Sequence, residues 1–204
     1  MRIISGLRRG LKLAAPPGLD TRPVLDRVKQ SWFDILGSRI DGARALDAFS
    51  GVGSLGLEAL SRGARSCVFI ENAPECVAML REHLERTGFA PRAEVLPARA
   101  SSALDALASR GAAFECIFLD PPFALAAEEA FYAPGGVLAR TAALCASGGV
   151  LMLRREGERR KRRDPFPPVV LPPGLRSSDR RQWGRNEVVF IERDAVGASN
   201  GGAT

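Results

Sequence analysis

The chain has 204 residues, of which 46% are hydrophobic and 25% charged, as in an ordinary soluble globular protein. No stretch approaches the roughly 18 uncharged apolar residues of a membrane span, and the first residues lack the apolar core of a signal peptide, so we expect a cytoplasmic protein without a membrane partner. One histidine and four cysteines without C-x-x-C spacing leave little material for a histidine triad, a zinc site or a disulfide framework, and we predict no metal.

The net charge of +6 is unevenly distributed. Residues 1–29 hold seven Lys or Arg against two Asp or Glu, and residues 154–185 hold eleven against four, so the remainder carries a net charge of −6. Two basic segments around an acidic core are typical of a catalytic domain with phosphate-binding surfaces, although segments that merely aid solubility would look the same. The candidate nucleic-acid contacts are Arg8, Arg9, Lys12, Arg22, Arg27, Arg160 and Lys161.

The first elements in chain order are a hairpin and a helix. Arg2–Ser5 and Leu11–Leu13 can pair about a turn at residues 8–10. From Asp26, a plausible N-cap, apolar residues recur at helical spacing as far as Gly37, which predicts an amphipathic helix. Trp32 shares its apolar stripe and is interpreted as core rather than as a base-stacking residue.

A strand, a glycine-rich turn and a helix are predicted around Leu46–Gly56, which reads L-D-A-F-S-G-V-G-S-L-G. Gly51 and Gly53 allow a sharp turn and the close approach of a ligand to the backbone. The helix that begins near Ser54 points its free N–H groups at the same place. A small ligand is therefore expected there.

One carboxylate decides between two ligands. Gly51, Gly53 and Gly56 satisfy G-x-G-x-x-G, and Glu71 lies twenty residues after the first of them, which is typical of dinucleotide binding. Asp47, however, would lie close to the pyrophosphate of NAD and repel it. A carboxylate favours a cation such as S-adenosylmethionine, which has an ammonium and a sulfonium but no phosphate. An incidental acid beside a plain glycine turn is the structural alternative.

Beyond this turn the apolar pattern alternates between strand and helix. Continuous apolar runs suit strands covered on both faces, so the alternation predicts an α/β fold with a doubly wound, mostly parallel sheet whose ligand lies at the carboxyl ends of the strands. The single histidine, His83, is predicted to be solvated on a charged helix. The expected strands are 66–70, 93–96, 116–119, 150–154 and 187–191; the expected helices lie around 76–84, 104–108 and, interrupted at 134–136, 128–146.

The segments outside this alternation are predicted to be irregular. The block Arg159–Arg163 is expected to be a loop, and Pro165–Pro173 an extended connector. Residues 195–204 are small and polar and are expected to be disordered. The four cysteines lie in apolar stretches and are interpreted as buried, reduced thiols.

A second motif, Asp120-Pro121-Pro122-Phe123, follows directly on an apolar strand. Two prolines make a rigid turn without backbone N–H groups, so the Asp120 carboxylate and the Pro121 carbonyl can both accept hydrogen bonds from an amine. Such acceptors would turn the lone pair of an exocyclic amine toward an incoming methyl group. Phe123 offers a stacking face, worth about 1–3 kcal/mol per base. A stiff loop with a packed phenylalanine is the alternative.

Together the two motifs resemble those of amino-methyltransferases. Met1–Gly6, Arg22-Pro23, Leu57–Ala64 and Trp183-Gly184 extend the likeness to the RsmD-type bacterial 16S ribosomal RNA (guanine-N2) methyltransferases. The resemblance implies a monomeric Rossmann-like enzyme with a small N-terminal hairpin extension, acting on a guanine of small-subunit ribosomal RNA. Its substrate would be 16S ribosomal RNA, within an assembly particle of the small subunit.

Several residues depart from the family pattern. Phe123 and Trp183 stand where tyrosine is usual, and Gln30 stands where glutamate is usual. Arg99 occupies a position where such enzymes carry an aspartate that accepts from the adenine amine of the cofactor. Arginine cannot accept a hydrogen bond. We therefore expect either that a backbone carbonyl near residues 98–100 accepts the hydrogen bond from the adenine amine, or that the cofactor binds more weakly.

The sequence therefore predicts an S-adenosylmethionine-dependent ribosomal RNA methyltransferase. We divide it into a basic hairpin and helix extension (1–37), a Rossmann-like methyltransferase domain (38–193) and a tail (194–204). An adenine-N6 methyltransferase and a non-catalytic nucleic-acid-binding protein are the alternatives. Asp120, Pro121 and Phe123 are the candidate catalytic residues, and the candidate cofactor-binding residues are Asp47, Phe49, Gly51, Gly53, Glu71 and Asn72.

Overall fold

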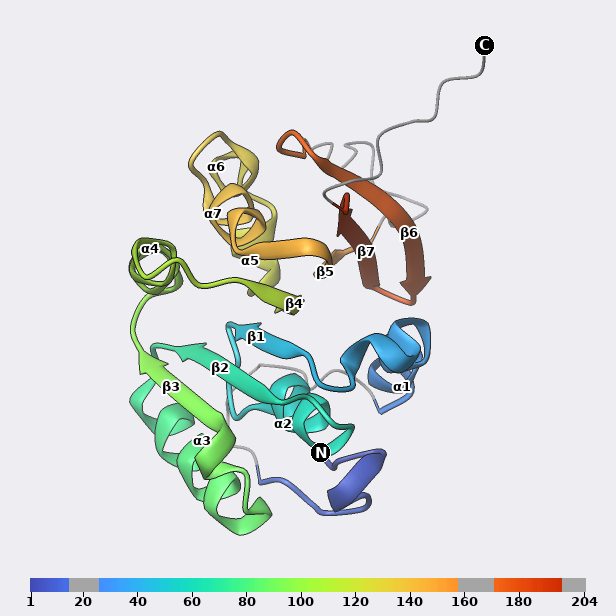
Figure 1. The fold of residues 1–204 in the computed structure, drawn as a ribbon, viewed down its shortest axis with the longest axis vertical. Coiled ribbons are helices and arrows are strands. Elements are labelled where there is room, and N and C mark those ends of the chain that lie inside the picture. The colour runs from blue at the N-terminus through green and yellow to red at the C-terminus, as the bar shows by residue number, and fades with distance from the viewer. Residues whose placement is uncertain (15–25, 158–170, 196–204) are drawn as a thin grey trace.

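A computed structural model describes residues 1–14, 26–157 and 171–195 and contains a seven-stranded sheet in the order β3-β2-β1-β4-β5-β7-β6 (Figure 1). The first five strands are parallel, and β7 runs antiparallel to both β5 and β6. The predicted doubly wound, mostly parallel sheet is confirmed, with an antiparallel hairpin at its C-terminal edge. The strands are β1 (Arg44–Ala48), β2 (Ser66–Glu71), β3 (Ala93–Pro97), β4 (Phe114–Leu119), β5 (Cys145–Glu156), β6 (Leu175–Trp183) and β7 (Asn186–Arg193).

Helices cover both faces of this sheet, and each layer has its own apolar core. One core joins Trp32 and Phe33 to the face of the sheet that carries Phe118, and the other joins Leu104 and Leu138 to the opposite face. The helices are α1 (Asp26–Leu36), α2 (Ser54–Ser61) and α3 (Pro74–Thr87) in the first layer, and α4 (Ala100–Ser109), α5 (Phe123–Ala126), α6 (Glu129–Tyr132) and α7 (Val137–Ala143) in the second. Short 3₁₀ turns span Gly6–Arg8, Gly37–Ile40 and Ala90–Arg92.

Most predicted elements are present, and the differences lie near the C-terminus. Strand β5 begins at Cys145, five residues before the predicted start, and the preceding helix ends at Ala143. Strand β6 was not predicted, because its sequence is polar and carries no apolar alternation. All four cysteines are buried free thiols, as expected. The predicted loop at 159–163, most of the connector at 165–173 and the tail from 196 lie outside the described residues.

The N-terminal hairpin is confirmed and is held to α2 by a buried carboxylate. Its two arms meet in one antiparallel bridge between Arg2 and Lys12. Glu58, which is fully buried, accepts hydrogen bonds from the backbone N–H groups of Ile4 (2.7 Å) and Ser5 (3.0 Å). The same carboxylate pairs with the fully buried ammonium of Lys29 at 3.3 Å. Because residues 1–14 and α1 share the core of the first layer, the boundary after residue 37 stays a prediction.

The prediction for His83 is wrong. Its side chain is 1% exposed and links two segments that lie far apart in the sequence. Nδ1 is 3.0 Å from the carbonyl oxygen of Val52, in the glycine turn, and Nε2 accepts from the N–H of Ala14 at 3.1 Å. Since a carbonyl can only accept, the ring is neutral with its proton on Nδ1. The histidine therefore joins the hairpin to the glycine turn.

Candidate active site

The two predicted motifs meet at the point where the strand order reverses. Asp47 is the fourth residue of β1, and Asp120 follows β4, the strand beside it. The register aligns Ala48 with Leu119, and the N–H of Asp120 donates to the carbonyl of Ala48 at 3.3 Å. In open α/β sheets, ligands bind at this switch point, outside the carboxyl ends of the strands. The fold therefore brings both acidic residues to one edge of the sheet.

Asp47 is a buried carboxylate with two other acids nearby. Its side chain is buried, and Oδ2 accepts a hydrogen bond from the N–H of Gly56 at 2.8 Å, within the first turn of α2. Burial, followed by the negative charges of Asp120 and Glu71, raises the pKa of Asp47 to about 7 despite the opposing hydrogen bond from Gly56. A bound cation would reverse this shift, so the site favours a positively charged ligand.

The glycines of the turn have different tasks. A side chain on Gly56 would lie 2.2 Å from the ring of Phe69, and one on Gly53 would lie 2.4 Å from Leu80, so close packing requires both. Gly51, with φ of +54°, faces open space, where a Cβ atom would meet nothing within 4 Å. Phe49 also has a positive φ, +66°, which is rare for a bulky residue and marks strain at this turn. The free space at Gly51 suits close approach of a ligand.

Glu71 at the end of β2 is bound to the same turn. Its Oε2 accepts from the N–H of Gly51 at 2.8 Å, and its Oε1 accepts from the N–H groups of Asn72 and Ala73, both at 2.8 Å. The carboxylate thus fixes the turn whether or not it also binds a ligand. Arg99 is exposed before α4, and its carbonyl accepts from Ala103 within that helix.

The Asp120 corner contains a residue that the sequence interpretation missed. Arg154 of β5 donates from Nε to Oδ1 of Asp120, and its guanidinium carbon lies 5.0 Å from the centre of the Phe123 ring. Burial raises the pKa of Asp120, and the charge of Arg154 opposes this shift. The register of β4 with β5 aligns Leu119 with Leu153, so Arg154 stands level with Asp120. Knowing that β4 and β5 are neighbours would have revealed the pair.

The predicted nucleic-acid contacts are only partly described. Arg9, Lys12 and Arg27 are exposed, and none of them forms an ion pair with another described residue. The Nε of Arg8 donates to the carbonyl of Thr87 at 2.7 Å. Three further candidates lie outside the described residues: Arg22, Arg160 and Lys161.

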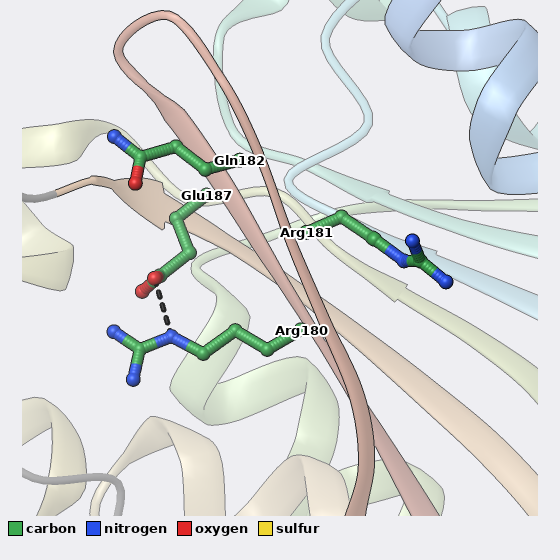
Figure 2. A pocket seen from close by; sticks show the side chains of 4 residues that line it. All are labelled: Arg180, Arg181, Gln182 and Glu187. Carbon is green, nitrogen blue, oxygen red and sulfur yellow. Dashed lines mark hydrogen bonds and ion pairs between the residues drawn. The ribbon is translucent and has the colours of Figure 1, made fainter.

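The hairpin β6–β7 carries a separate shallow cavity of about 310 Å³, lined by Arg180, Arg181, Gln182 and Glu187. Figure 2 shows Arg180 directed toward Glu187, with which it forms an ion pair, and Arg181 on the opposite side of the hairpin. Of the predicted site residues that the structure describes, none lines this cavity. Four arginines of the hairpin are ion-paired with acids, namely Arg176, Arg180, Arg181 and Arg185, so this region offers less free positive charge than its sequence suggests.

The described part of the chain has two further properties, which concern membrane-spanning helices and clusters of metal ligands. Among the described residues, no helix is long and apolar enough to cross a membrane. In the same part of the chain, no group of three or more His, Cys, Asp or Glu side chains could hold a metal ion.

Comparison with known proteins finds relatives of this chain. A family model described as conserved hypothetical protein 95 matches residues 1–165. YlbH of Bacillus subtilis is 42% identical over 123 residues, which cover 60% of this chain and 67% of YlbH. The Escherichia coli protein named ribosomal RNA small subunit methyltransferase D is 41% identical over 123 residues, 60% of each chain. The aligned part therefore spans about two thirds or less of these relatives.

A solved structure extends the likeness over almost the whole chain. The Escherichia coli protein yhhF, described as a methyltransferase, superposes with a TM-score of 0.76 at 31% identity, covering 96% of this chain and 98% of that one. The α/β Rossmann-like methyltransferase fold predicted from the sequence is thus confirmed, as is the resemblance to the small-subunit ribosomal RNA methyltransferases.

Proposed function

We propose that this chain, which belongs to the conserved hypothetical protein 95 family, is an S-adenosylmethionine-dependent methyltransferase of the exocyclic N2 amine of a guanine in 16S ribosomal RNA. One observation carries the proposal: a buried carboxylate suited to a cation and an acceptor corner suited to an amine lie on adjacent strands at the switch point. The substrate of the proposed enzyme is small-subunit RNA within an assembly particle. The enzyme acts in the cytoplasm as a monomer.

Each predicted catalytic or cofactor-binding residue has a role in this mechanism. Asp47 and the turn at Gly51 and Gly53 hold the methionine part of the cofactor, with Phe49 and Asn72 beside them, and Glu71 binds the ribose hydroxyls. Asp120 and the carbonyl of Pro121 orient the target amine while Phe123 stacks on the base. S-adenosylmethionine would supply a sulfonium methyl group for direct in-line transfer to the amine nitrogen, where the new N–C bond forms as the C–S bond breaks; the demethylated thioether would leave, and the amine proton would pass to the carboxylate of Asp120.

A methyl-transfer assay tests the proposal. Small-subunit particles that lack the modification are incubated with the protein and cofactor carrying a labelled methyl group, and the digested RNA is separated into nucleosides. We expect label in N2-methylguanosine. Label in N6-methyladenosine would refute the guanine assignment but keep the amine mechanism, whereas a methylated ring carbon would refute both.

Affinity for the cofactor should depend on pH through Asp47. With a pKa of about 7 in the free protein, this carboxylate is largely protonated at pH 6, and a bound cation restores its charge by releasing the proton. Affinity for S-adenosylmethionine should therefore decrease as the pH falls below 7, and the decrease should be at most about tenfold per pH unit. Calorimetry at pH 6 in two buffers with different ionisation heats measures the released proton.

Variants of Asp47 provide the controls. Asp47→Asn should abolish the pH dependence, and Asp47→Ala should weaken cofactor binding by more than about tenfold, the equivalent of about 1.4 kcal/mol. NAD should not bind, because its pyrophosphate would meet three neighbouring carboxylates, Asp47, Glu71 and Asp120. Preferential binding of NAD, or an affinity that is constant from pH 5.5 to 7.5, would contradict the assigned role of Asp47.

Affinity for RNA should depend on salt through the exposed basic residues of the N-terminal part. Neutralising Arg9, Lys12 and Arg27 should reduce the slope of log affinity against log salt by about one for each RNA phosphate that the variant no longer binds. A matched pair, Arg176→Gln and Arg185→Gln, removes arginines already neutralised by Glu192 and Glu156 and should change the slope less. An unchanged slope in the triple variant would favour the solubility interpretation.

A further inference from the structure

The acceptor corner at Asp120 already holds a planar group of donors. The guanidinium of Arg154 donates to Oδ1 of Asp120 and, through Nη1, to Oδ1 of Asn186 at 2.9 Å. It also lies over the ring of Phe123, at 5.0 Å. Arginine thus makes both kinds of contact that the mechanism assigns to the target base, a hydrogen bond to the carboxylate and a stack on the aromatic ring.

The shape of this group corresponds to one nucleobase edge. A guanidinium is a carbon bonded to three nitrogens with N–H groups in one plane. C2 of guanine is likewise bonded to three nitrogens, and two of them, N1 and N2, carry hydrogens on the Watson–Crick edge. Adenine has its N6 amine next to N1, which carries no hydrogen. The lone pair of N1 would therefore face the lone pairs of the second acceptor, Oδ1 of Asn186, and repel them. Arg154 is therefore a mimic of guanine rather than of adenine.

The second acceptor is fixed in orientation. Nδ2 of Asn186 donates to the carbonyl of Trp183 at 3.3 Å, which leaves Oδ1 of the same amide facing Arg154. The side chains of Arg154 and Asp120 are each only 13% exposed. The arginine occupies Oδ1 of Asp120, so a base cannot bind that oxygen while the arginine stays in place.

We propose that Arg154 occupies the base position in the ligand-free protein and withdraws when the target nucleotide enters, and that Asp120 and Asn186 then select guanine through its two adjacent donors. The identity of the base rests on the proposed function, whereas the occupancy of the corner does not. Arg154 is thus a specificity-determining residue: an RNA base must match the guanidinium to replace it.

The test is the binding of small molecules to Arg154→Met, which keeps the length of the side chain but loses its charge and donors. Ligand-observed NMR at pH 8 compares methylguanidinium, GMP and AMP on the full chain. If the corner is open in about a tenth of wild-type molecules, emptying it should strengthen binding of methylguanidinium and GMP by about tenfold and leave AMP unchanged. No gain for either ligand would overturn the proposal.

Two controls separate the corner from general effects. Arg185→Met removes an arginine of the β6–β7 hairpin that is paired with Glu156 and more exposed than Arg154, and this variant should bind all three ligands as the wild type does. Adding Asp120→Ala, which removes the acceptor, to Arg154→Met should abolish the gain. A gain for methylguanidinium alone, or an equal gain for GMP and AMP, would overturn the selection of guanine.

A measurement on the wild type covers the case in which Arg154→Met fails to fold. The Nε–H of Arg154 should exchange slowly with water in the free protein and faster when GMP is saturating; unchanged exchange would overturn the proposal. These results are independent of methyl transfer. If the small molecules bind as expected while RNA is not methylated, the proposed function fails and the occupancy of the corner stands. If RNA is methylated but the small molecules do not bind as expected, only the role of Arg154 is refuted.

Discussion

Replacing Asp120 by alanine should lower turnover by about 10²–10⁴-fold while cofactor affinity falls far less, because this carboxylate orients the amine and does not hold the cofactor. The measurement is single-turnover methyl transfer to small-subunit particles, alongside calorimetric binding of the cofactor. Alanine also leaves the largely buried guanidinium of Arg154 without a carboxylate, so Asp120→Asn is the cleaner variant: it keeps an acceptor and removes the charge.

The neighbouring aromatic residue provides the control. Phe123→Ala should lower turnover because the base can no longer stack, an effect of about 1–3 kcal/mol, whereas Phe123→Tyr should be tolerated because the ring remains. Equal losses of turnover and cofactor affinity in Asp120→Asn would show that the residue acts on the cofactor, contrary to the proposed mechanism. Full activity of Asp120→Ala, which removes both the charge and the acceptor, would remove it from the site.

The second large effect is expected on stability, from Glu58. Replacing it by alanine should lower the free energy of unfolding by about 3–5 kcal/mol, because the ammonium of Lys29 would remain buried without its carboxylate. The backbone N–H groups of Ile4 and Ser5 would lose their acceptor at the same time. Urea unfolding at pH 7 measures the loss.

An exposed ion pair serves for comparison. Glu94 pairs with Arg110 at 2.9 Å, with both side chains about half exposed, and Glu94→Ala should cost less than about 1 kcal/mol. If Glu58→Ala and Glu94→Ala lose stability equally, the buried network contributes no more than a surface pair. Cofactor binding should weaken only in the Glu58 variant, since Lys29 lies 3.4 Å from the hydroxyl of Ser54, the first residue after the glycine turn.

The sequence was most informative where local chemistry dictates structure. Strand β4 contains four consecutive fully buried apolar residues, Cys116 to Leu119, and such a run is typical of a strand covered on both faces. The turn after Asp47 requires glycine for both its conformation and its packing, so its position could be predicted. Asp120 follows from the same rule, because the carboxyl ends of parallel strands share one edge of the sheet.

What the sequence could not reveal depends on contacts between distant segments. Strand β6 is polar on both faces and is stabilised by pairing with β7 and by ion pairs such as Arg180 with Glu187, neither of which leaves a periodic signal. His83 lies on a charged helix, and its burial arises from Val52 and Ala14, which are 31 and 69 residues away. The pair of Arg154 with Asp120 requires the strand order, which no local pattern gives.

The attachment of the hairpin also sets an order of events during synthesis. Its partners are Glu58, His83 and Thr87, which follow residues 4–14 by 53 to 79 positions. Residues 1–14 therefore lack part of their contacts until helices α2 and α3 have both left the ribosome. Closing such a long loop costs only slightly more conformational entropy than closing a shorter one. Docking is therefore delayed by the rate of translation rather than made unfavourable by loop closure. A nascent chain arrested before residue 87 should leave its first fourteen residues open to protease, and one that exposes the end of α3 should protect them.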